Sequence, residues 1–240
     1  MKHRRCCIDR IPLAGSRAVS PASRIWENGS VLKVRFISGN WKMQKQVKET
    51  AQKWSKYANI HFDFSNAMDA VIRISFDRNL GSWSYIGKDA LRISKQKATM
   101  NLGWLDEQVI LHEFGHVIGL THQHQNPTSG IQWDKEAVYE DLSGPPNYWD
   151  TASVDMHVFN KYSEDLIQAT TVDSLSIMRF PIPDKWTTNH FLADFNPCLS
   201  ERDKAFIATL YPYDKENIVA KEEDKMRKYQ GVLANSREEF

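Results

Sequence analysis

The stretch HEFGHVIGLTH occupies positions 112–122 of this chain of 240 residues. His112 and His116 are four residues apart, so on an α-helix they lie on one face, one turn apart, and both imidazoles can reach a single ion. Glu113 lies beside them, where it can hold a water molecule instead of binding the ion itself. The spacing predicts a metal site carried by a helix.

The end of this helix provides a third candidate ligand. Gly119 can adopt a positive φ, which lets the chain leave the helix sharply and bring His122 to the same ion. Three nitrogen ligands and an open fourth position are typical of a catalytic zinc, whereas a structural zinc is closed by a fourth residue, commonly cysteine. Cys6, Cys7 and Cys198 are all distant from the motif in sequence. The pattern therefore favours one catalytic Zn2+ held by three histidines.

A second motif follows downstream, where residues 176–180 read SIMRF. The extended histidine string is the signature of the metzincin peptidases, in which a methionine turn comes later in the chain. Met178 is the residue expected beneath the three imidazoles. On its own, a methionine at this position would be interpreted as a flexible filler of the core.

The chain resembles the metzincin metallopeptidases, nearest to the astacin-like family and with some matrixin-like features. Astacins carry the motifs HExxHxxGFxHE and SxMHY; here Leu120 replaces the phenylalanine, Gln123 the final glutamate and Phe180 the tyrosine. The first and last residues of the final helix, beginning LSERD at 199–203, also resemble both families. The resemblance covers about residues 31–213.

These departures remove two features of the astacins. Phe180 cannot act as the tyrosine that binds zinc and then moves to the reacting oxygen, and Gln123 cannot provide the acidic contact for a new amino terminus. Tyr162, His190 and His124 are candidates for stabilising the oxyanion in place of the tyrosine. Surface or packing roles are the simpler interpretation of all three, and for His124 an exposed position in a polar loop.

The rest of the sequence is typical of an α+β protein. Leu32, Val34 and Phe36 alternate with charged residues, which predicts a half-buried strand, and apolar residues spaced by three or four from Met43 to Ala58 predict an amphipathic helix. The fold class expected is a metzincin-type zincin: a twisted mixed sheet of about five strands, two long helices in an upper subdomain, and an irregular lower subdomain with a C-terminal helix. Strands are predicted at 31–37, 60–64, 70–76, within 81–97 and at 98–102, and helices at 43–58, 108–118, 135–142, 152–162 and after Ser200, where Asp203 completes an acidic capping box.

Composition limits the other possibilities. Lys and Arg number 31 against 30 Asp and Glu, a net charge of +1, which gives no general attraction to nucleic acid or to an anionic membrane. No apolar run reaches the ~18 residues that a membrane helix needs. We expect a protein or peptide substrate, no nucleic acid, no membrane span and a monomer.

The domain organisation follows from changes in composition along the chain. Residues 1–24 are rich in Arg, Ser and Pro without periodicity, which predicts a flexible arm. A single catalytic domain is expected over 25–213, with its upper subdomain at about 25–122 and its lower subdomain at about 123–213. The charged residues 214–240 are predicted to form a tail.

The arm also raises the question of control. Cys6 or Cys7 could bind the zinc as an inhibitory thiolate, as a pro-segment cysteine does in matrixins. The surrounding residues do not match that family's segment, which argues against this role. No segment resembles a long pro-domain, so we expect a chain that is active as made or controlled by a separate partner. The family resemblance favours an extracellular protein, whereas the lack of a standard signal peptide and of a disulfide set argues for the cytoplasm or non-standard export.

The resemblance implies zinc-dependent hydrolysis of peptide bonds in extended polypeptides, with a zinc-bound water activated by Glu113. In this family the substrate lies antiparallel to the edge strand before the active-site helix. The matching segment here consists of Ala98, Thr99, Met100, Asn101 and Leu102.

Two other functions remain open. One is a non-catalytic, zinc-stabilised module that binds peptides, and the other is a zinc amidase or protease restricted to a narrow target. Glu113 argues against the first of these, because binding alone does not require a base.

Overall fold

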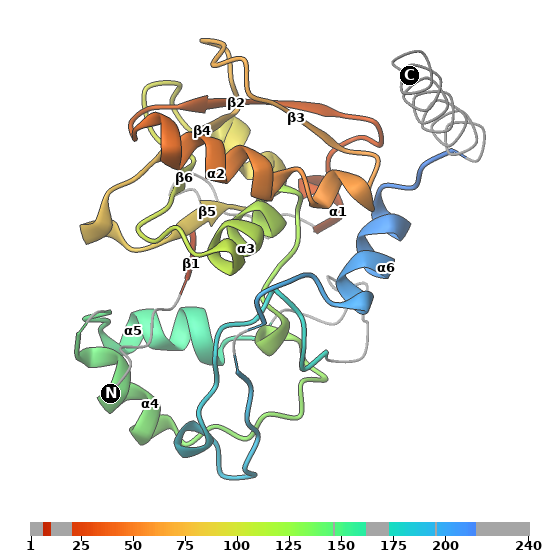
Figure 1. Ribbon diagram of the computed structural model, residues 1–240. Helices are drawn as coiled ribbons and strands as arrows, with labels where there is room; N and C mark the ends of the chain where they lie inside the picture. Colours follow the sequence, from red (N-terminus) through yellow and green to blue (C-terminus); the bar gives the residue numbers. More distant parts are fainter. Residues whose placement is uncertain (1–6, 11–20, 146, 162–172, 195, 215–240) are drawn as a thin grey trace, which may run out of the picture.

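The computed structural model describes residues 7–10, 21–145, 147–161, 173–194 and 196–214, and its upper part is built on a mixed sheet (Figure 1). The strand order is β1-β5-β6-β4-β2-β3. Strands β2, β3, β4 and β6 are parallel, β5 is antiparallel to β6, and β1 runs parallel to β5. Five of the strands confirm the predicted sheet, and the sixth, β1, comes from the N-terminal arm. The strands are β1 (Ile8–Arg10), β2 (Val31–Phe36), β3 (His61–Asp63), β4 (Ile72–Ser75), β5 (Trp83–Tyr85) and β6 (Met100–Asn101).

Two helices of the upper part pack against each other beside the sheet (Figure 1). They are α2 (Trp41–Ala51), which Asn40 caps by accepting hydrogen bonds from two backbone N–H groups, and α3 (Glu107–Val117). The helix predicted at 43–58 is shorter in the structure, because α2 ends at Ala51. A separate short 3-10 turn follows at Trp54–Lys56. In that turn Trp54 is fully buried and donates its indole N–H to the carbonyl of Leu111, at 3.0 Å.

Helix α3 is buried along its whole second half, from Ile110 to Val117. A helix segment that has no exposed face must be covered by other elements on all sides. Figure 1 shows α3 between the sheet with α2 above it and the lower part of the molecule below it. Its histidines are therefore held at the centre of the protein and not on its surface.

The lower part has its own hydrophobic cluster. Helix α4 (Lys135–Ser143) confirms its prediction. The stretch expected to be helical at 152–162 is helical up to Phe159, as α5 (Thr151–Val154) followed by a single π-helical turn, Asp155–Phe159. The cluster consists of Ile131, Val138, Leu142, Trp149, Val154, Val158, Phe180, Ile182, Trp186 and Ala193.

Helix α6 (Glu201–Leu210) begins with the predicted capping box of Ser200 and Asp203. It does not belong to the lower cluster, since Ile207 and the following Tyr211 pack into the upper core. Tyr211 donates its hydroxyl to the carbonyl of Ile118 at the end of α3, at 2.8 Å, and burial raises the pKa of Tyr211 to about 12. The predicted boundary between 122 and 123 therefore does not follow the packing, because α6 and Tyr211 return to the upper part.

The prediction of a flexible arm over 1–24 is wrong for the described residues 7–10 and 21–24. The first of these segments contains β1, in which Ile8 pairs with Trp83 and Arg10 with Tyr85. The second is α1 (Pro21–Arg24), where Arg24 forms an ion pair with the buried Asp89, at 3.0 Å. Within the described part of the chain, no helix has the length and apolar character to cross a membrane.

Candidate metal centre

Three imidazole rings meet at the end of α3. His112 and His116 project from one face of the helix, and His122 reaches them from the loop that follows. Their Nε2 atoms are 3.1 Å apart for the pairs that involve His112 and 3.3 Å apart between His116 and His122. The rings are between 0% and 6% exposed. The structure thus brings together the three ligands expected from the sequence.

Backbone carbonyls hold two of these rings in one orientation. The Nδ1 of His112 lies 2.7 Å from the carbonyl oxygen of Ile177, and the Nδ1 of His116 lies 2.9 Å from that of Leu120. A neutral imidazole has one N–H group, and a carbonyl only accepts, so the hydrogen belongs on Nδ1. The Nε2 atoms therefore carry lone pairs that face one another.

Lone pairs that converge in this way fit a cation. Ligand nitrogens bound at ≈ 2.0–2.1 Å in a tetrahedral zinc site are about 3.3 Å from each other. The observed separations of 3.1 and 3.3 Å are close to that value. Orienting a histidine ligand through its other ring nitrogen is also the usual arrangement around zinc. The donor set fits Zn2+ without rearrangement.

The turn that delivers His122 depends on Gly119. This residue has a φ of +95°, which L side chains rarely adopt, and a Cβ there would lie 2.6 Å from the side chain of Ile25. After the turn, the N–H of Gln123 donates to the carbonyl of Met178, at 3.0 Å. This hydrogen bond joins the loop of the third histidine to the segment that the sequence predicts as a methionine turn.

Met178 lies against α3 at a glycine. A Cβ added to Gly115 would be only 2.2 Å from the sulfur of Met178 and 3.3 Å from the ring of Trp54. Both neighbours are buried, at 1% and 0% exposure. Gly115 thus allows the methionine to pack directly on the helix between the two zinc-ligand candidates.

Replacing Gly115 by alanine should therefore destabilise the protein by about 1–3 kcal/mol, the usual cost of overpacking, although alanine is the better helix former. Urea unfolding measures the change. In a Met178→Ala background the same substitution should cost clearly less, because the clash is removed. Equal costs in the two backgrounds would show that the contact does not limit position 115.

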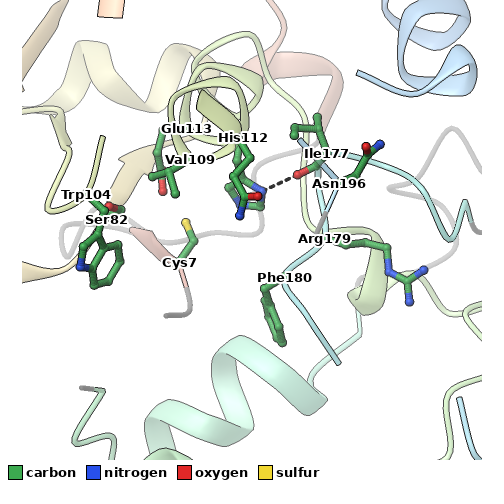
Figure 2. Close-up of a pocket in the computed structure, with 11 residues that line it drawn as sticks. Cys7, Ser82, Trp104, Val109, His112, Glu113, Ile177, Arg179, Phe180 and Asn196 are labelled. Atoms are coloured by element: carbon green, nitrogen blue, oxygen red, sulfur yellow. Dashed lines mark hydrogen bonds between the residues drawn. The ribbon is translucent and has the colours of Figure 1, made fainter. Parts of the chain in front are cut away.

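A fourth potential ligand comes from the arm. The Sγ of Cys7 and the ligand nitrogens of His112, His116 and His122 all lie within 4.8 Å of one another. Figure 2 shows Cys7 beneath α3, with its sulfur directed toward the helix that carries His112 and Glu113. Of the two cysteines that the sequence offered as an inhibitory zinc ligand, Cys7 lies at the histidines, although the residues around it do not match the matrixin segment. The residues around Cys7 form no motif that predicts a metal ligand. The pairing of β1 with β5 brings the thiol to the histidines.

Glu113 is fully buried and lines a pocket that Cys7 and His112 also line (Figure 2). It does not belong to the group of metal-ligand candidates. Its carboxylate is therefore next to the histidines but separate from them, which is the place expected for a general base.

The segment expected to bind substrate lies inside the sheet, and that prediction is wrong. β6 pairs with β5 on one side and with β4 on the other. The backbone N–H groups on both sides of it are also hydrogen-bonded within the sheet. The N–H of Thr99 donates to the carbonyl of Arg73, and the N–H of Leu102 donates to the carbonyl of Ser75. Ala98 to Leu102 therefore cannot add a peptide strand. Within residues 25–213 the last strand on this side of the sheet is β5, and β1 of the arm pairs with its other edge.

Of the oxyanion candidates, His124 lies beside the ligand candidate His122, with 5.0 Å between the ring centroids. His124 is fully buried, contrary to the expected exposed loop position; its Nε2 lies 2.9 Å from the carbonyl oxygen of His157, and its ring packs on Phe180. His190 is exposed and forms an ion pair with Asp184, at 3.1 Å. Tyr162 lies outside the described residues.

Two further residues line the pocket beyond His112. Phe180 provides an apolar wall and contacts the His122 ring edge-on, with 5.9 Å between ring centroids. Arg179 is 7% exposed, packs its guanidinium over the ring of Phe191 and extends away from Cys7 and Glu113 (Figure 2). Burial lowers the pKa of Arg179 to about 10. Sequence reasoning had not assigned either residue to the pocket.

Comparison with known proteins gives one family. Residues 18–137 match the family model of the astacin peptidases. Tolloid-like protein 1 of Mus musculus is 29% identical over 126 residues, which is 50% of this chain and 11% of that protein. Bone morphogenetic protein 1 of Xenopus laevis is 28% identical over 134 residues, or 52% of this chain and 18% of that protein. The chain thus spans less than a fifth of the length of these curated relatives.

Two solved structures extend the comparison over most of the chain. A structure of myroilysin is 41% identical, with a TM-score of 0.78 and coverage of 81% of this chain and 98% of that one. High choriolytic enzyme 1, a hatching enzyme zinc-protease from Oryzias latipes, is 17% identical with a TM-score of 0.57, and covers 80% of this chain and 96% of that one. The second comparison supports the fold alone.

Proposed function

Because the chain belongs to the astacin family of peptidases, we propose that it is a zinc-dependent metalloendopeptidase acting on extended polypeptides. The observation that carries the proposal is the convergence of three Nε2 atoms within 3.3 Å of each other, beside the buried carboxylate of Glu113. His112, His116 and His122 would hold the zinc. Met178 would support them from below.

Zinc bound there would polarise the scissile carbonyl and lower the pKa of a bound water to ≈ 7. The chain's own contribution is the general base. Glu113 would accept the proton of the attacking water and later deliver it to the leaving amine. Its burial keeps the carboxylate in place beside the histidines and removes it from competing solvent.

We assign the substrate to β5, because this strand forms the outer edge of the sheet of residues 25–213. An extended peptide would bind there by strand addition, with main-chain hydrogen bonds giving affinity. In this structure β1 occupies that edge with three residue pairs. It runs parallel to β5, whereas the family resemblance implies an antiparallel substrate, so the arm passes through the site in the reverse direction.

The position of Cys7 supports a latent state of the enzyme. A thiolate bound to the zinc would fill the open fourth position that catalysis requires. Strand pairing of β1 holds the thiol there, so the arm would block both the metal and the substrate edge. We propose that activity requires release of this arm.

The alternative of a non-catalytic peptide-binding module is less consistent with the site. Such a module would need the edge strand and the zinc, but no carboxylate enclosed in the same pocket. Glu113 is 0% exposed and lines that pocket, where peptide binding alone would need no base. A protease limited to a narrow target would use this same site. Cleavage of a peptide library would distinguish such a protease from a general one.

Metal analysis of the purified chain tests the proposal. We expect one zinc per chain and its loss in His116→Ala, while His190→Ala, at an exposed histidine, keeps the metal. After release of the arm, the protein should cleave a peptide library; a chelator should abolish cleavage and added zinc restore it. A chain without zinc, or cleavage that survives complete metal removal, would overturn the proposal.

A further inference from the structure

The buried acidic residue in the first turn of α6 has an unusual set of neighbours. Asp203 is 6% exposed, and its Oδ1 accepts the hydroxyl of Ser176 at 2.6 Å. Its Oδ2 accepts the backbone N–H groups of Ile177 at 2.8 Å and of Ser200 at 3.0 Å. Burial raises the pKa of Asp203, while these hydrogen bonds act in the opposite direction. Only the bond to Ser200 belongs to the helix cap; the other two reach the turn at 176–178.

Those two hydrogen bonds hold the peptide groups on both sides of Ile177. The N–H of Ile177 donates to Asp203 directly. The next peptide group contains the carbonyl of Ile177 and the N–H of Met178, which donates to the hydroxyl of Ser176 at 3.1 Å. That hydroxyl in turn donates to Asp203. Because a peptide group is planar, holding its N–H also sets the direction of its carbonyl.

The carbonyl so directed is the one that orients a zinc-ligand candidate. The oxygen of Ile177 lies 2.7 Å from the Nδ1 of His112 (Figure 2). A continuous set of hydrogen bonds therefore runs from Asp203 through Ser176 and the peptide of Ile177 to His112. All members of this set are buried, so water cannot replace a lost contact at low cost.

We propose that Asp203 is a positioning residue for the zinc site, which aims the carbonyl of Ile177 at His112 and so sets the direction of that ligand. The inference rests on the proposed zinc function and extends it to α6, a helix that provides no ligand. Outer contacts of this kind typically change metal affinity by about 10–100-fold when removed.

The alternative is that Asp203 only caps α6. Ser200 offers the matched control, since its hydroxyl accepts the N–H of Asp203 at 2.9 Å and is the other half of the capping box. Ser200→Ala removes this cap contact and leaves the bond from Ile177 to Asp203. Ser176→Ala does the reverse, because it interrupts the path to His112 without touching the cap.

The experiment compares zinc affinity, by competition with a chromophoric chelator, in the wild-type chain and in Asp203→Ala, Asp203→Asn, Ser176→Ala and Ser200→Ala. All measurements are made well below each variant's Tm. We expect Asp203→Ala to weaken zinc binding about 10–100-fold, Ser176→Ala to weaken it several-fold, and Ser200→Ala to leave it nearly unchanged. Asp203→Asn should recover most of the affinity, because its amide oxygen can still accept from Ile177.

Equal zinc affinities in Ser176→Ala and Ser200→Ala would overturn the inference, and this comparison stands even if Asp203→Ala does not fold. So would an Asp203→Ala chain that binds zinc as tightly as wild type. Either result leaves the proposed function intact. A wild-type chain that binds no zinc would instead overturn the proposed function and this inference together.

Discussion

Glu113→Ala is expected to lower kcat for peptide hydrolysis by about 10²–10⁴-fold, the contribution usual for a general base, while the chain still binds one zinc. The physical reason is that the carboxylate is buried in the pocket beside the histidines but is not one of the metal-ligand candidates. The rate should be measured on a chain that also carries Cys7→Ala, so that the site is open. Zinc content should be measured on the same sample.

Glu107→Ala is the matched control for this substitution. Glu107 lies on the same helix, is partly exposed and forms an ion pair with Lys53, at 2.5 Å. Its replacement should change the rate less than about two- or three-fold, since an exposed ion pair contributes little. If Glu113→Ala cleaved peptides as fast as its parent with zinc bound, the proposed mechanism would be wrong.

Cys7→Ala is expected to raise the peptidase activity of the intact chain on the order of 10²-fold or more. A tethered ligand acts at an effective concentration in the millimolar range, so the thiolate would occupy the fourth zinc position almost all the time. Without it, the arm competes with substrate only through the three residue pairs of β1. The rate on a quenched fluorescent peptide, with chain length checked by mass spectrometry, gives the change.

Two other cysteines provide the controls. Cys6→Ala changes the neighbour in sequence, and Cys198→Ala removes an exposed thiol; neither should raise activity. A thiol-modifying reagent should activate the wild-type chain and leave Cys7→Ala unaffected. Equal activities of the intact wild-type and Cys7→Ala chains would contradict the proposed latent state. They would not contradict the proposed zinc site.

The features that sequence reasoning recovered depend on short-range patterns. The separation of His112 and His116 follows from the helical period, and the φ of +95° at Gly119 confirms the predicted turn. The capping box of Ser200 and Asp203 is also local, since its two partners are three residues apart. Each of these features is encoded within one or two helical turns, so the sequence contains all the information needed to predict it.

The features that sequence reasoning missed depend on contacts between distant parts of the chain. The residues of β6 suit an edge strand as well as an inner one, and only the pairing with both β4 and β5 places this strand inside the sheet. His124 is polar and follows the zinc motif, yet packing against Phe180 buries it completely. Strand order and packing partners are decided by the total free energy of the fold, which a local pattern does not contain.

The amino-acid sequence by itself determined the candidate site: two histidines at helical spacing with a glutamate beside them, a third histidine after a glycine turn, and hence the proposal of a zinc peptidase of the metzincin type. Only the tertiary structure decided which other residues lie at that site. It brings Cys7 to the histidines through the pairing of β1 with β5, and it places Asp203 behind His112 through the return of α6 to the upper core. The physical reason is the same in both cases. Hydrogen bonds between segments that are distant in the chain form only if they offset the entropy lost in closing the intervening loop. They do so only when the whole fold forms.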